Sequence, residues 1–197
     1  MKLIFISGPS GSGKTTLSKK IIEKVKNGIV LSTDNYYKTG LLSKLLSKFI
    51  EGYFDRDISF NYRLFKKDFY YIVKNGISKY ERSYDFKKKK IENFYNDTNN
   101  INFLIIEGIF AKELSTTLHN QNYFLLELKI SKNECMKRVL KRDFKERGKA
   151  VKIAKNDFIK SWDIYYKKSK NSCIKNKNVF IITRNTNIEQ ILKKLFD

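Results

Sequence analysis

Short runs of apolar residues, nearly unbroken by polar ones, recur along the chain and are separated by longer segments of mixed character. Runs of this length and composition are typical of strands that are buried on both faces of a parallel sheet. The pattern therefore predicts strands at 2–7, 29–32, 103–107, 124–130 and 179–183.

Most of the segments between these runs repeat apolar residues every three or four positions, as amphipathic helices do. Strands that alternate with helices predict an α/β fold, a doubly wound parallel sheet with flanking helices, formed by residues 1–197 as one domain. Ligands of such sheets bind at the carboxyl ends of the strands. The helical stripes are Ile21, Ile22 and Val25; Met136, Val139 and Leu140; and Ile188, Ile191, Leu192 and Leu195.

The stretch from about 36 to 102 interrupts this alternation. It is long, aromatic and charged, and it lies between the predicted strands at 29–32 and 103–107. We therefore expect a mostly helical insertion that lies beside the active site and provides the pocket for a second substrate.

The first apolar run leads directly into a segment that fits the spacing G-x-x-x-x-G-K-[ST], namely Gly8-Pro9-Ser10-Gly11-Ser12-Gly13-Lys14-Thr15. Glycines allow backbone conformations that a Cβ forbids, so successive N–H groups can surround an anion. In such a loop the lysine reaches the β- and γ-phosphates, the next hydroxyl binds Mg²⁺, and the helix that follows, at 14–26, directs its positive end at the phosphates.

A glycine-rich turn before a helix is the alternative interpretation of this segment. The complete spacing after a strand favours the P-loop NTPase fold and a site for ATP or GTP with Mg²⁺. The predicted nucleotide-binding residues are Gly8, Ser10, Gly11, Ser12, Gly13, Lys14, Thr15 and Thr16.

Two carboxylates stand where apolar runs end. Asp34 follows the run 29–32, and Glu107 closes the run 103–107. Both are expected at the carboxyl edge of the sheet, where a carboxylate can accept a proton from an attacking hydroxyl or bind magnesium. Asp34 could instead cap a helix or form an Asx-turn, and Glu107 could be a surface carboxylate before the turn at Gly108.

The formal net charge is +21, with a pI near 9.8. Such a charge is typical of proteins that bind nucleic acid, but lysine far outnumbers arginine and the excess extends over the whole chain, with one dense run at 87–90. We therefore do not expect a nucleic-acid partner. We also expect no membrane partner, because no apolar run approaches the roughly 18 residues of a membrane helix.

Cysteine usage favours a reducing compartment. Cys135 and Cys173 lack the spacing of a metal or redox motif, and His119 is the single histidine, which excludes a histidine-based metal site. The apolar run before the phosphate loop is too short for a signal-peptide core. Together these features predict a cytoplasmic protein.

Five further segments carry distinctive motifs. They are Ser32-Thr33-Asp34-Asn35-Tyr36-Tyr37-Lys38, Phe54-Asp55, Ser83-Tyr84-Asp85-Phe86, Ile105-Ile106-Glu107-Gly108-Ile109, and Arg138 followed by Arg142-Asp143-Phe144-Lys145-Glu146-Arg147-Gly148-Lys149. With the phosphate loop they resemble the uridine kinase and phosphoribulokinase family of P-loop kinases, from the first strand to about Asn178.

This resemblance implies roles for individual residues. Asp34 would activate the acceptor hydroxyl, and Glu107 would lie near the metal with Thr15. The remaining substrate residues would be Tyr37, Phe54, Asp55, Tyr84 and Phe86, and a lid at 138–149 would close over the phosphates through Arg138, Arg142, Arg147 and Lys149.

Each of these roles has a competing interpretation. The lid arginines could form a solvated helix face that ends at Gly148 as a C-cap. Asp55 could pair with Arg56 or Arg63 instead of binding sugar hydroxyls. Tyr84 and Phe86 could be core residues in a chain with 15 Phe and 12 Tyr.

Several positions depart from the family pattern, all on the acceptor side. Lys89 replaces a histidine of the base pocket, Lys149 replaces the last lid arginine, and Asp157-Phe158 replaces a Gln-Tyr pair. A lysine at 89 could favour an acceptor with its own phosphate or carboxylate. The resemblance predicts a Mg²⁺-dependent kinase of uridine or cytidine.

Three alternatives stay open beside this prediction. They are a kinase of another small metabolite, a nucleic-acid-processing ATPase, and a nucleotide-dependent switch whose acceptor site has decayed. Family members often form homo-oligomers, but no segment of the sequence identifies an interface.

Overall fold

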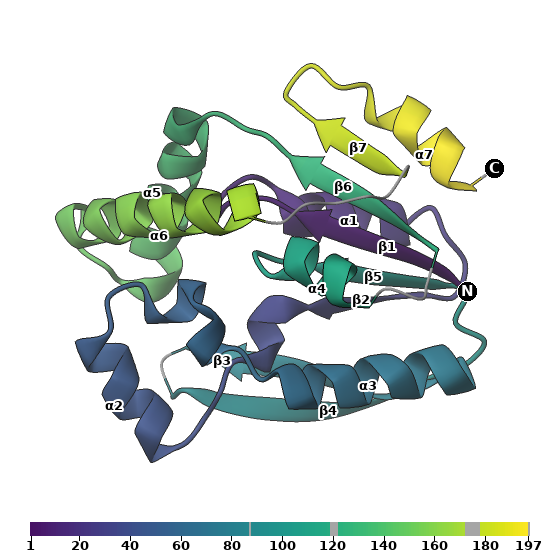
Figure 1. The fold of residues 1–197 in the computed structure, drawn as a ribbon, viewed down its shortest axis with the longest axis horizontal. Coiled ribbons are helices and arrows are strands. Elements are labelled where there is room, and N and C mark those ends of the chain that lie inside the picture. Colours follow the sequence, from purple (N-terminus) through teal and green to yellow (C-terminus); the bar gives the residue numbers. More distant parts are fainter. Residues whose placement is uncertain (87, 119–121, 172–177, 197) are drawn as a thin grey trace.

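The computed structural model describes residues 1–86, 88–118, 122–171 and 178–196, so Lys87, His119 and Cys173 lie outside the described residues. Five parallel strands form the central sheet: β1 (Lys2–Ser7), β2 (Gly28–Ser32), β5 (Phe103–Glu107), β6 (Tyr123–Leu128) and β7 (Val179–Ile182). Their order is β2-β5-β1-β6-β7 (Figure 1). The five predicted strands are confirmed, with boundaries that differ by at most two residues.

Helices cover both faces of this sheet, as predicted. Side chains of β1 alternate, so that Ile4 and Ile6 face α1 (Lys14–Ile22) and α7 (Ile188–Phe196), in one apolar cluster. Leu3 and Phe5 face α3 (Tyr62–Asn75) and α4 (Ala111–Thr117), in another. The first helix ends four residues before its predicted end at 26.

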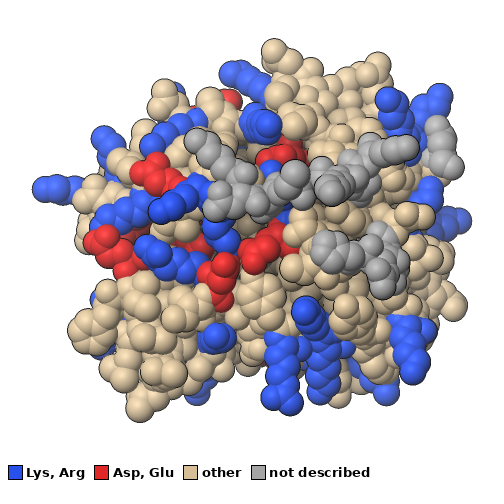
Figure 2. All heavy atoms as spheres, in the orientation of Figure 1, with Lys and Arg blue, Asp and Glu red and all other residues tan. Residues whose placement is uncertain are grey.

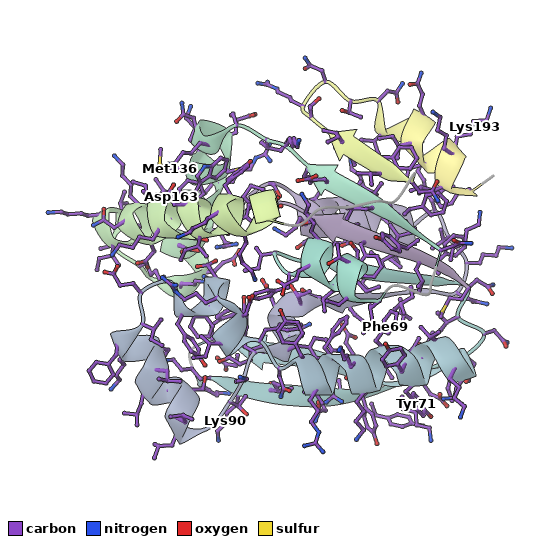
Figure 3. All side chains as sticks on the ribbon, viewed as in Figure 1. Phe69, Tyr71, Lys90, Met136, Asp163 and Lys193 are labelled. Atoms are coloured by element: carbon purple, nitrogen blue, oxygen red, sulfur yellow. The ribbon has the colours of Figure 1, made fainter. Side chains whose placement is uncertain are left out.

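Helix α3 lies along the lower edge of the molecule with its apolar stripe turned inward. Phe69 points toward the sheet and is fully buried, whereas Tyr71 points away from it and is exposed (Figure 3). Because buried residues recur at Phe65, Phe69 and Ile72, the helix binds the insertion to the main core.

Two long helices, α5 (Lys132–Arg147) and α6 (Val151–Asn171), lie beyond the carboxyl ends of the strands. They pack through a small apolar cluster of Cys135, Val139 and Phe158, in which Cys135 is a buried free thiol. In the described part of the chain, no helix is both long and apolar enough to cross a membrane.

The prediction of a mostly helical insertion at 36–102 was wrong in part. Besides α3, the region contains α2 (Leu41–Phe49) and the short 3-10 turns η2 (Tyr53–Asp55) and η3 (Asp57–Ser59), and a further 3-10 turn, η1 (Thr33–Tyr36), leads into it. It also contains an antiparallel hairpin of β3 (Ser78–Asp85) and β4 (Lys90–Thr98). Charged residues stand at inward as well as outward positions of this hairpin, Arg82 among them, so the sequence lacks a clear period of two.

Candidate active site

The phosphate loop connects β1 to α1 and depends on glycine at defined positions. Gly13 has φ 101 directly before α1, and Gly11 has φ 78. A Cβ on Gly11 would lie 2.5 Å from the carbonyl oxygen of Cys135. Only glycine fits such a backbone this close to α5, so the loop is a shaped cradle and not a generic turn.

The polar groups of this loop fit a phosphate anion. The Ser12 hydroxyl is buried and has no hydrogen-bond partner within the described residues. Lys14 Nζ donates to the carbonyl oxygens of Gly8 (2.9 Å) and Pro9 (3.0 Å). Burial lowers the pKa of Lys14, and the nearby carboxylates of Glu107 and Asp34 oppose this. An anion at the loop would satisfy the Ser12 hydroxyl and favour the charged lysine.

Thr16, also predicted to bind nucleotide, is exposed on the first turn of α1, and Ser10 is partly exposed in the loop. Arg138 of α5 reaches the same loop. Its Nη1 donates to the carbonyl oxygens of Gly11 (3.3 Å) and Ser12 (3.4 Å). The structure thus brings Arg138, the one predicted nucleotide-binding residue that is distant in the sequence, into contact with the phosphate loop.

Glu107 and Thr15 form the second part of the site. Glu107 is 4% exposed, and the Thr15 hydroxyl lies 3.5 Å from each of its carboxylate oxygens. Burial, followed by the charge of Asp34, raises the pKa of Glu107, whereas Lys14 and hydrogen bonds from Ser32 and Thr15 lower it. The alternative that Glu107 is a surface carboxylate was wrong.

A hydroxyl beside a carboxylate is the oxygen donor set that Mg²⁺ prefers, with substrate phosphates and waters completing the shell. The described residues contain no cluster of three or more His, Cys, Asp or Glu that could enclose a metal. A site of this kind therefore fits Mg²⁺ that arrives with a nucleotide.

Asp34 lies in η1, directly after β2, whose last residue Ser32 is in register with Glu107. No side-chain cap stabilises the start of η1, so Asp34 is not the helix cap considered from the sequence. The Tyr37 hydroxyl donates to Asp34 Oδ1 at 3.3 Å. The carboxylate lies near both Lys14 and Glu107, because its charge raises the pKa of each.

Gly108 sets how closely η1 approaches β5. Its φ is +139, and a Cβ there would lie 1.8 Å from the Thr33 hydroxyl oxygen. That hydroxyl is buried without a hydrogen-bond partner among the described residues. The close packing of Thr33 on Gly108 holds Asp34 beside Glu107.

Four aromatic residues predicted to line the acceptor pocket pack on one another. The rings of Tyr37 and Phe54 lie 5.0 Å apart, those of Tyr84 and Phe86 also 5.0 Å, and Tyr37 contacts Tyr84 at 5.3 Å. Tyr84 is 5% exposed, whereas Phe54 and Phe86 are half-buried. Tyr84 therefore belongs to the core, whereas Phe54 and Phe86 pack against it and are only partly buried; that these rings line an acceptor pocket stays a prediction.

Lys89 does not join this aromatic cluster. It stands in the turn between β3 and β4 with φ 52, and its Nζ lies 2.5 Å from the Ser47 hydroxyl of α2. Its amine therefore ties the hairpin to α2. The expectation that Lys89 favours an acceptor phosphate has no support in this contact.

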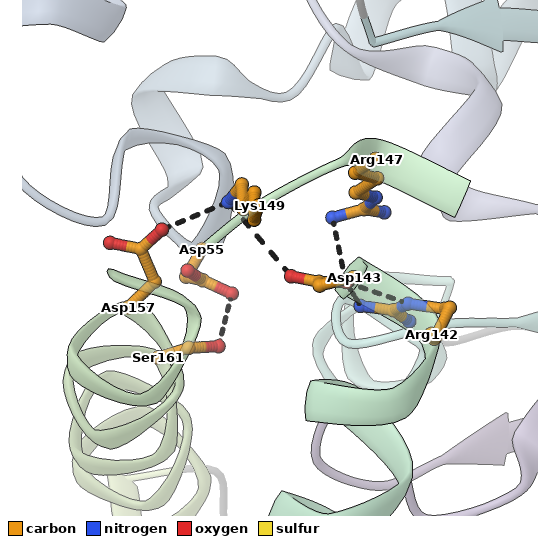
Figure 4. A network of polar contacts seen from close by, with 7 residues as sticks. All are labelled: Asp55, Arg142, Asp143, Arg147, Lys149, Asp157 and Ser161. Atoms are coloured by element: carbon orange, nitrogen blue, oxygen red, sulfur yellow. Dashed lines mark hydrogen bonds and ion pairs between the residues drawn. The ribbon is translucent and has the colours of Figure 1, made fainter. Parts of the chain in front are cut away.

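Asp55 is held by α6. The Ser161 hydroxyl donates to Asp55 Oδ1 at 2.6 Å (Figure 4). Burial raises the pKa of Asp55 to about 6, and the Ser161 hydrogen bond opposes this rise. The proposed pairs with Arg56 and Arg63 were wrong: Arg56 Nε donates to the Glu51 carbonyl oxygen, and neither arginine forms an ion pair with Asp55 in the described structure.

The lid cations converge on one buried carboxylate, that of Asp143, which is 3% exposed. Arg142 donates to its Oδ1 from Nε (3.0 Å) and Nη2 (2.9 Å). Arg147 Nη1 lies 3.6 Å from the same oxygen, and Lys149 Nζ lies 3.9 Å from Oδ2 (Figure 4). Gly148 does end α5 as its C-cap, with φ 62, but these cations do not form a fully solvated face.

The guanidinium of Arg147 also stacks 4.7 Å from the centre of the Phe86 ring. This contact joins the lid to the aromatic cluster of the acceptor side. In Figure 2, acidic and basic side chains gather together on the left of the view, over α5 and α6, whereas the charged side chains along the mostly uncharged lower edge are lysine and arginine.

The sequence assigned no role to three residues that the structure places in the site: Asp143, Asp157 and Ser161. Asp143 lies within the lid motif, between Arg142 and Arg147, and this placement of an acid among lid cations was a usable signal. Asp157 was noted only as a departure from the family pattern and Ser161 not at all, because their partners Lys149 and Asp55 come near only through the packing of α6.

Known proteins of one family resemble this chain over most of its length. The sequence model of the "Phosphoribulokinase / Uridine kinase family" matches residues 3–178. The uridine kinase of Ureaplasma parvum serovar 3 is 32% identical over 156 residues, which cover 75% of this chain and 72% of the relative. The uridine kinase of Borrelia duttonii is 30% identical over 165 residues, covering 82% and 76%.

Solved structures share the fold at lower identity. YFH7 from Saccharomyces cerevisiae superposes with a TM-score of 0.68 at 11% identity, covering 94% of this chain and 93% of that one. The YGR205w protein superposes with a TM-score of 0.62 at 17% identity, covering 93% and 86%.

Proposed function

The chain belongs to the phosphoribulokinase and uridine kinase family, and from this premise we propose that it transfers the γ-phosphate of ATP or GTP to the 5′-hydroxyl of uridine or cytidine. It is a P-loop phosphotransferase whose acceptor is a small-molecule hydroxyl. One observation supports transfer to a hydroxyl: Lys14, Asp34 and Glu107 come from three different segments, and the charge of Asp34 acts on both of the others. The choice of uridine or cytidine follows the relatives named uridine kinase.

The phosphate loop would hold the triphosphate through its amides, the Ser12 hydroxyl and Lys14. The positive φ of Gly11 and of Gly13 would let successive amides turn toward the phosphates, and Lys14 would exchange its contacts with the Gly8 and Pro9 carbonyls for contact with phosphate. Arg138, at the outer rim of the loop, would contact the nucleotide from the side of α5.

Thr15 and Glu107 would hold Mg²⁺. When bound, this ion neutralises the negative charge of the β- and γ-phosphates. Glu107 would be ionised next to the metal, because a nearby cation favours the carboxylate despite its burial.

Asp34 would accept the proton of the attacking hydroxyl. Its carboxylate lies at the end of β2 and accepts a hydrogen bond from Tyr37, which restrains its orientation. Asp55, fixed by Ser161, would accept hydrogen bonds from neighbouring hydroxyls of the acceptor and so align it with Asp34.

The lid residues Arg142, Arg147 and Lys149 would exchange part of their contact with Asp143 for contact with phosphate. Guanidinium groups bind phosphate through paired hydrogen bonds and exclude water that would hydrolyse the donor. Because Asp143 already gathers these cations, their like-charge repulsion is reduced before the nucleotide binds.

The test is ADP release, measured with ATP, Mg²⁺ and a panel of acceptors: uridine, cytidine, pantothenate, ribulose 5-phosphate and nucleoside monophosphates. We expect release to rise with uridine or cytidine, and the product to be the nucleoside 5′-phosphate. If another compound of the panel alone stimulates release, that compound and not uridine or cytidine is the acceptor. Slow ADP release that no acceptor changes would indicate a switch instead of a kinase.

A further inference from the structure

Asp157 of α6 lies where the lid meets the acceptor side of the site. Its Oδ2 accepts a hydrogen bond from Lys149 Nζ at 2.9 Å, whereas that amine lies 3.9 Å from Asp143 Oδ2 (Figure 4). Lys149 is thus held more closely by α6 than by the lid itself. The contact draws the last lid cation toward the helix that also holds Asp55.

The same carboxylate acts on Asp55. Groups from several elements face Asp55: Ser161, Asp157 and Lys168 from α6, Asp34 from η1, Lys14 from α1, and Tyr37. Among these, Asp34 and Asp157 carry like charge and raise its pKa, whereas Lys14 and the Ser161 hydroxyl lower it. Asp34 and Asp157 therefore add negative charge around Asp55 that Lys14 offsets in part, and the cation that contacts Asp157, Lys149, is already paired with it.

Positions 149 and 157 are two of those that depart from the family pattern, and the structure pairs them with each other. A glutamine at 157 could not neutralise a cation at 149, because it has no charge. The carboxylate at 157 therefore introduces both the ion pair and an additional negative charge beside Asp55.

We propose that Asp157 determines the class of acceptor: by holding Lys149 on α6 and placing a carboxylate near Asp55, it selects an uncharged hydroxyl compound over one that carries phosphate or carboxylate. The inference rests on the proposed kinase function of this site. It assigns to Asp157 an electrostatic role at a distance, so Asp157 is a positioning and specificity residue and not a catalytic one.

The expected size of the effect follows from exposure. The side chains of Lys149 and Asp157 are 36% and 50% exposed, so solvent screens their interaction. Removing the charge at 157 should therefore raise the ratio of kcat/KM for an anionic acceptor to that for a neutral one by about twofold to fivefold.

The experiment compares Asp157→Asn with the native chain, using uridine and ribulose 5-phosphate as acceptors. Asp163→Asn is the matched control, since Asp163 lies on the same helix, is 68% exposed and pairs with Lys132 at 3.7 Å. We expect the ratio to rise in Asp157→Asn and to stay unchanged in Asp163→Asn. A second variant, Asp157→Asn with Lys149→Gln, should lose the gain, because the freed cation is then absent.

Two further measurements test the role of Asp157 and do not depend on catalytic turnover. Equilibrium dialysis gives the affinities for uridine and ribulose 5-phosphate, and a ¹³C NMR titration follows the Asp55 carboxyl. In Asp157→Asn, affinity for the anionic compound should rise and the pKa of Asp55 should fall below its native value.

The inference is overturned if the acceptor ratio and the Asp55 titration are both unmoved in Asp157→Asn, or if the native chain prefers ribulose 5-phosphate. If no acceptor stimulates ADP release in the native chain, the proposed function fails, and the dialysis and NMR results still decide the role of Asp157.

Discussion

The donor half and the acceptor half of this site are built in different ways. On the donor side, backbone geometry positions the functional groups: β1 and β2 both pair with β5, so Ile6 and Ser32 lie in register with Glu107. On the acceptor side, side chains hold side chains across long sequence distances, as Asp55 and Ser161 do over 106 positions. The donor half is therefore held by the backbone ladder of the sheet, and the acceptor half by side-chain contacts between distant segments.

This difference determines what a substitution changes. A donor-side residue is held by a hydrogen-bonded ladder, so replacing its side chain leaves the scaffold intact and removes one chemical role. An acceptor-side residue is both ligand and support, since its polar contacts also hold the segments in place. The following predictions test that contrast.

Asp34→Asn should produce the largest effect and a purely chemical one. Loss of the proton acceptor should reduce kcat by about 10²- to 10⁴-fold while leaving ATP affinity unchanged. Single-turnover kinetics and nucleotide titration measure the two quantities, with exposed Asp97→Asn of β4 as the control. Unchanged turnover would remove Asp34 from the mechanism.

Gly108→Ala and Gly148→Ala compare how strongly the donor half and the acceptor half require glycine at a position of positive φ. Both glycines have positive φ, but a Cβ on Gly108 meets Thr33 at 1.8 Å, whereas nothing lies within 4 Å of a Cβ on Gly148. We expect losses in unfolding free energy of about 3 kcal/mol or more and about 1 kcal/mol, respectively. Urea denaturation checks the order, and equal losses would contradict the close packing described for Thr33.

Lys14→Ala should weaken nucleotide binding itself. Because a hydrogen-bonded charge at a phosphate contributes about 1.5–3 kcal/mol, we expect roughly a ten- to hundredfold rise in the dissociation constant. Isothermal titration with a nonhydrolysable ATP analogue measures it, beside Lys19→Ala on the exposed face of α1. Normal affinity in Lys14→Ala would contradict the assignment of the loop.

Asp55 should make folding stability depend on pH. Its folded pKa of about 6 lies above the ordinary 3.8, so between these values the folded chain binds more protons than the unfolded one. Stability should therefore fall as pH rises from about 4 to 6, by on the order of 2 kcal/mol from this group. Asp55→Asn should flatten that fall in urea denaturation series, and an identical slope in both proteins would count against the raised pKa.

The elements of the donor half could be predicted because their signals are local. The runs at 2–7 and 103–107 coincide with β1 and β5, and the spacing of the phosphate loop is continuous in the chain. The hairpin β3–β4 was missed because its inward positions are a mixture: Tyr84 packs in the core, but Arg82 pairs with Asp68 of α3 at 2.5 Å. A charge at an inward position hides the alternation on which strand prediction depends.

The sequence by itself determined the fold class, the phosphate loop and the two carboxylates at the ends of strands, since periodicity and spacing act between near neighbours. Only the tertiary structure decided which partner each charge has: Asp143 for the lid arginines, Ser161 for Asp55, and Asp157 for Lys149. Those pairings depend on how α5 and α6 pack over the insertion. Electrostatic energy depends on distance in space and on burial, neither of which is encoded by position along the chain.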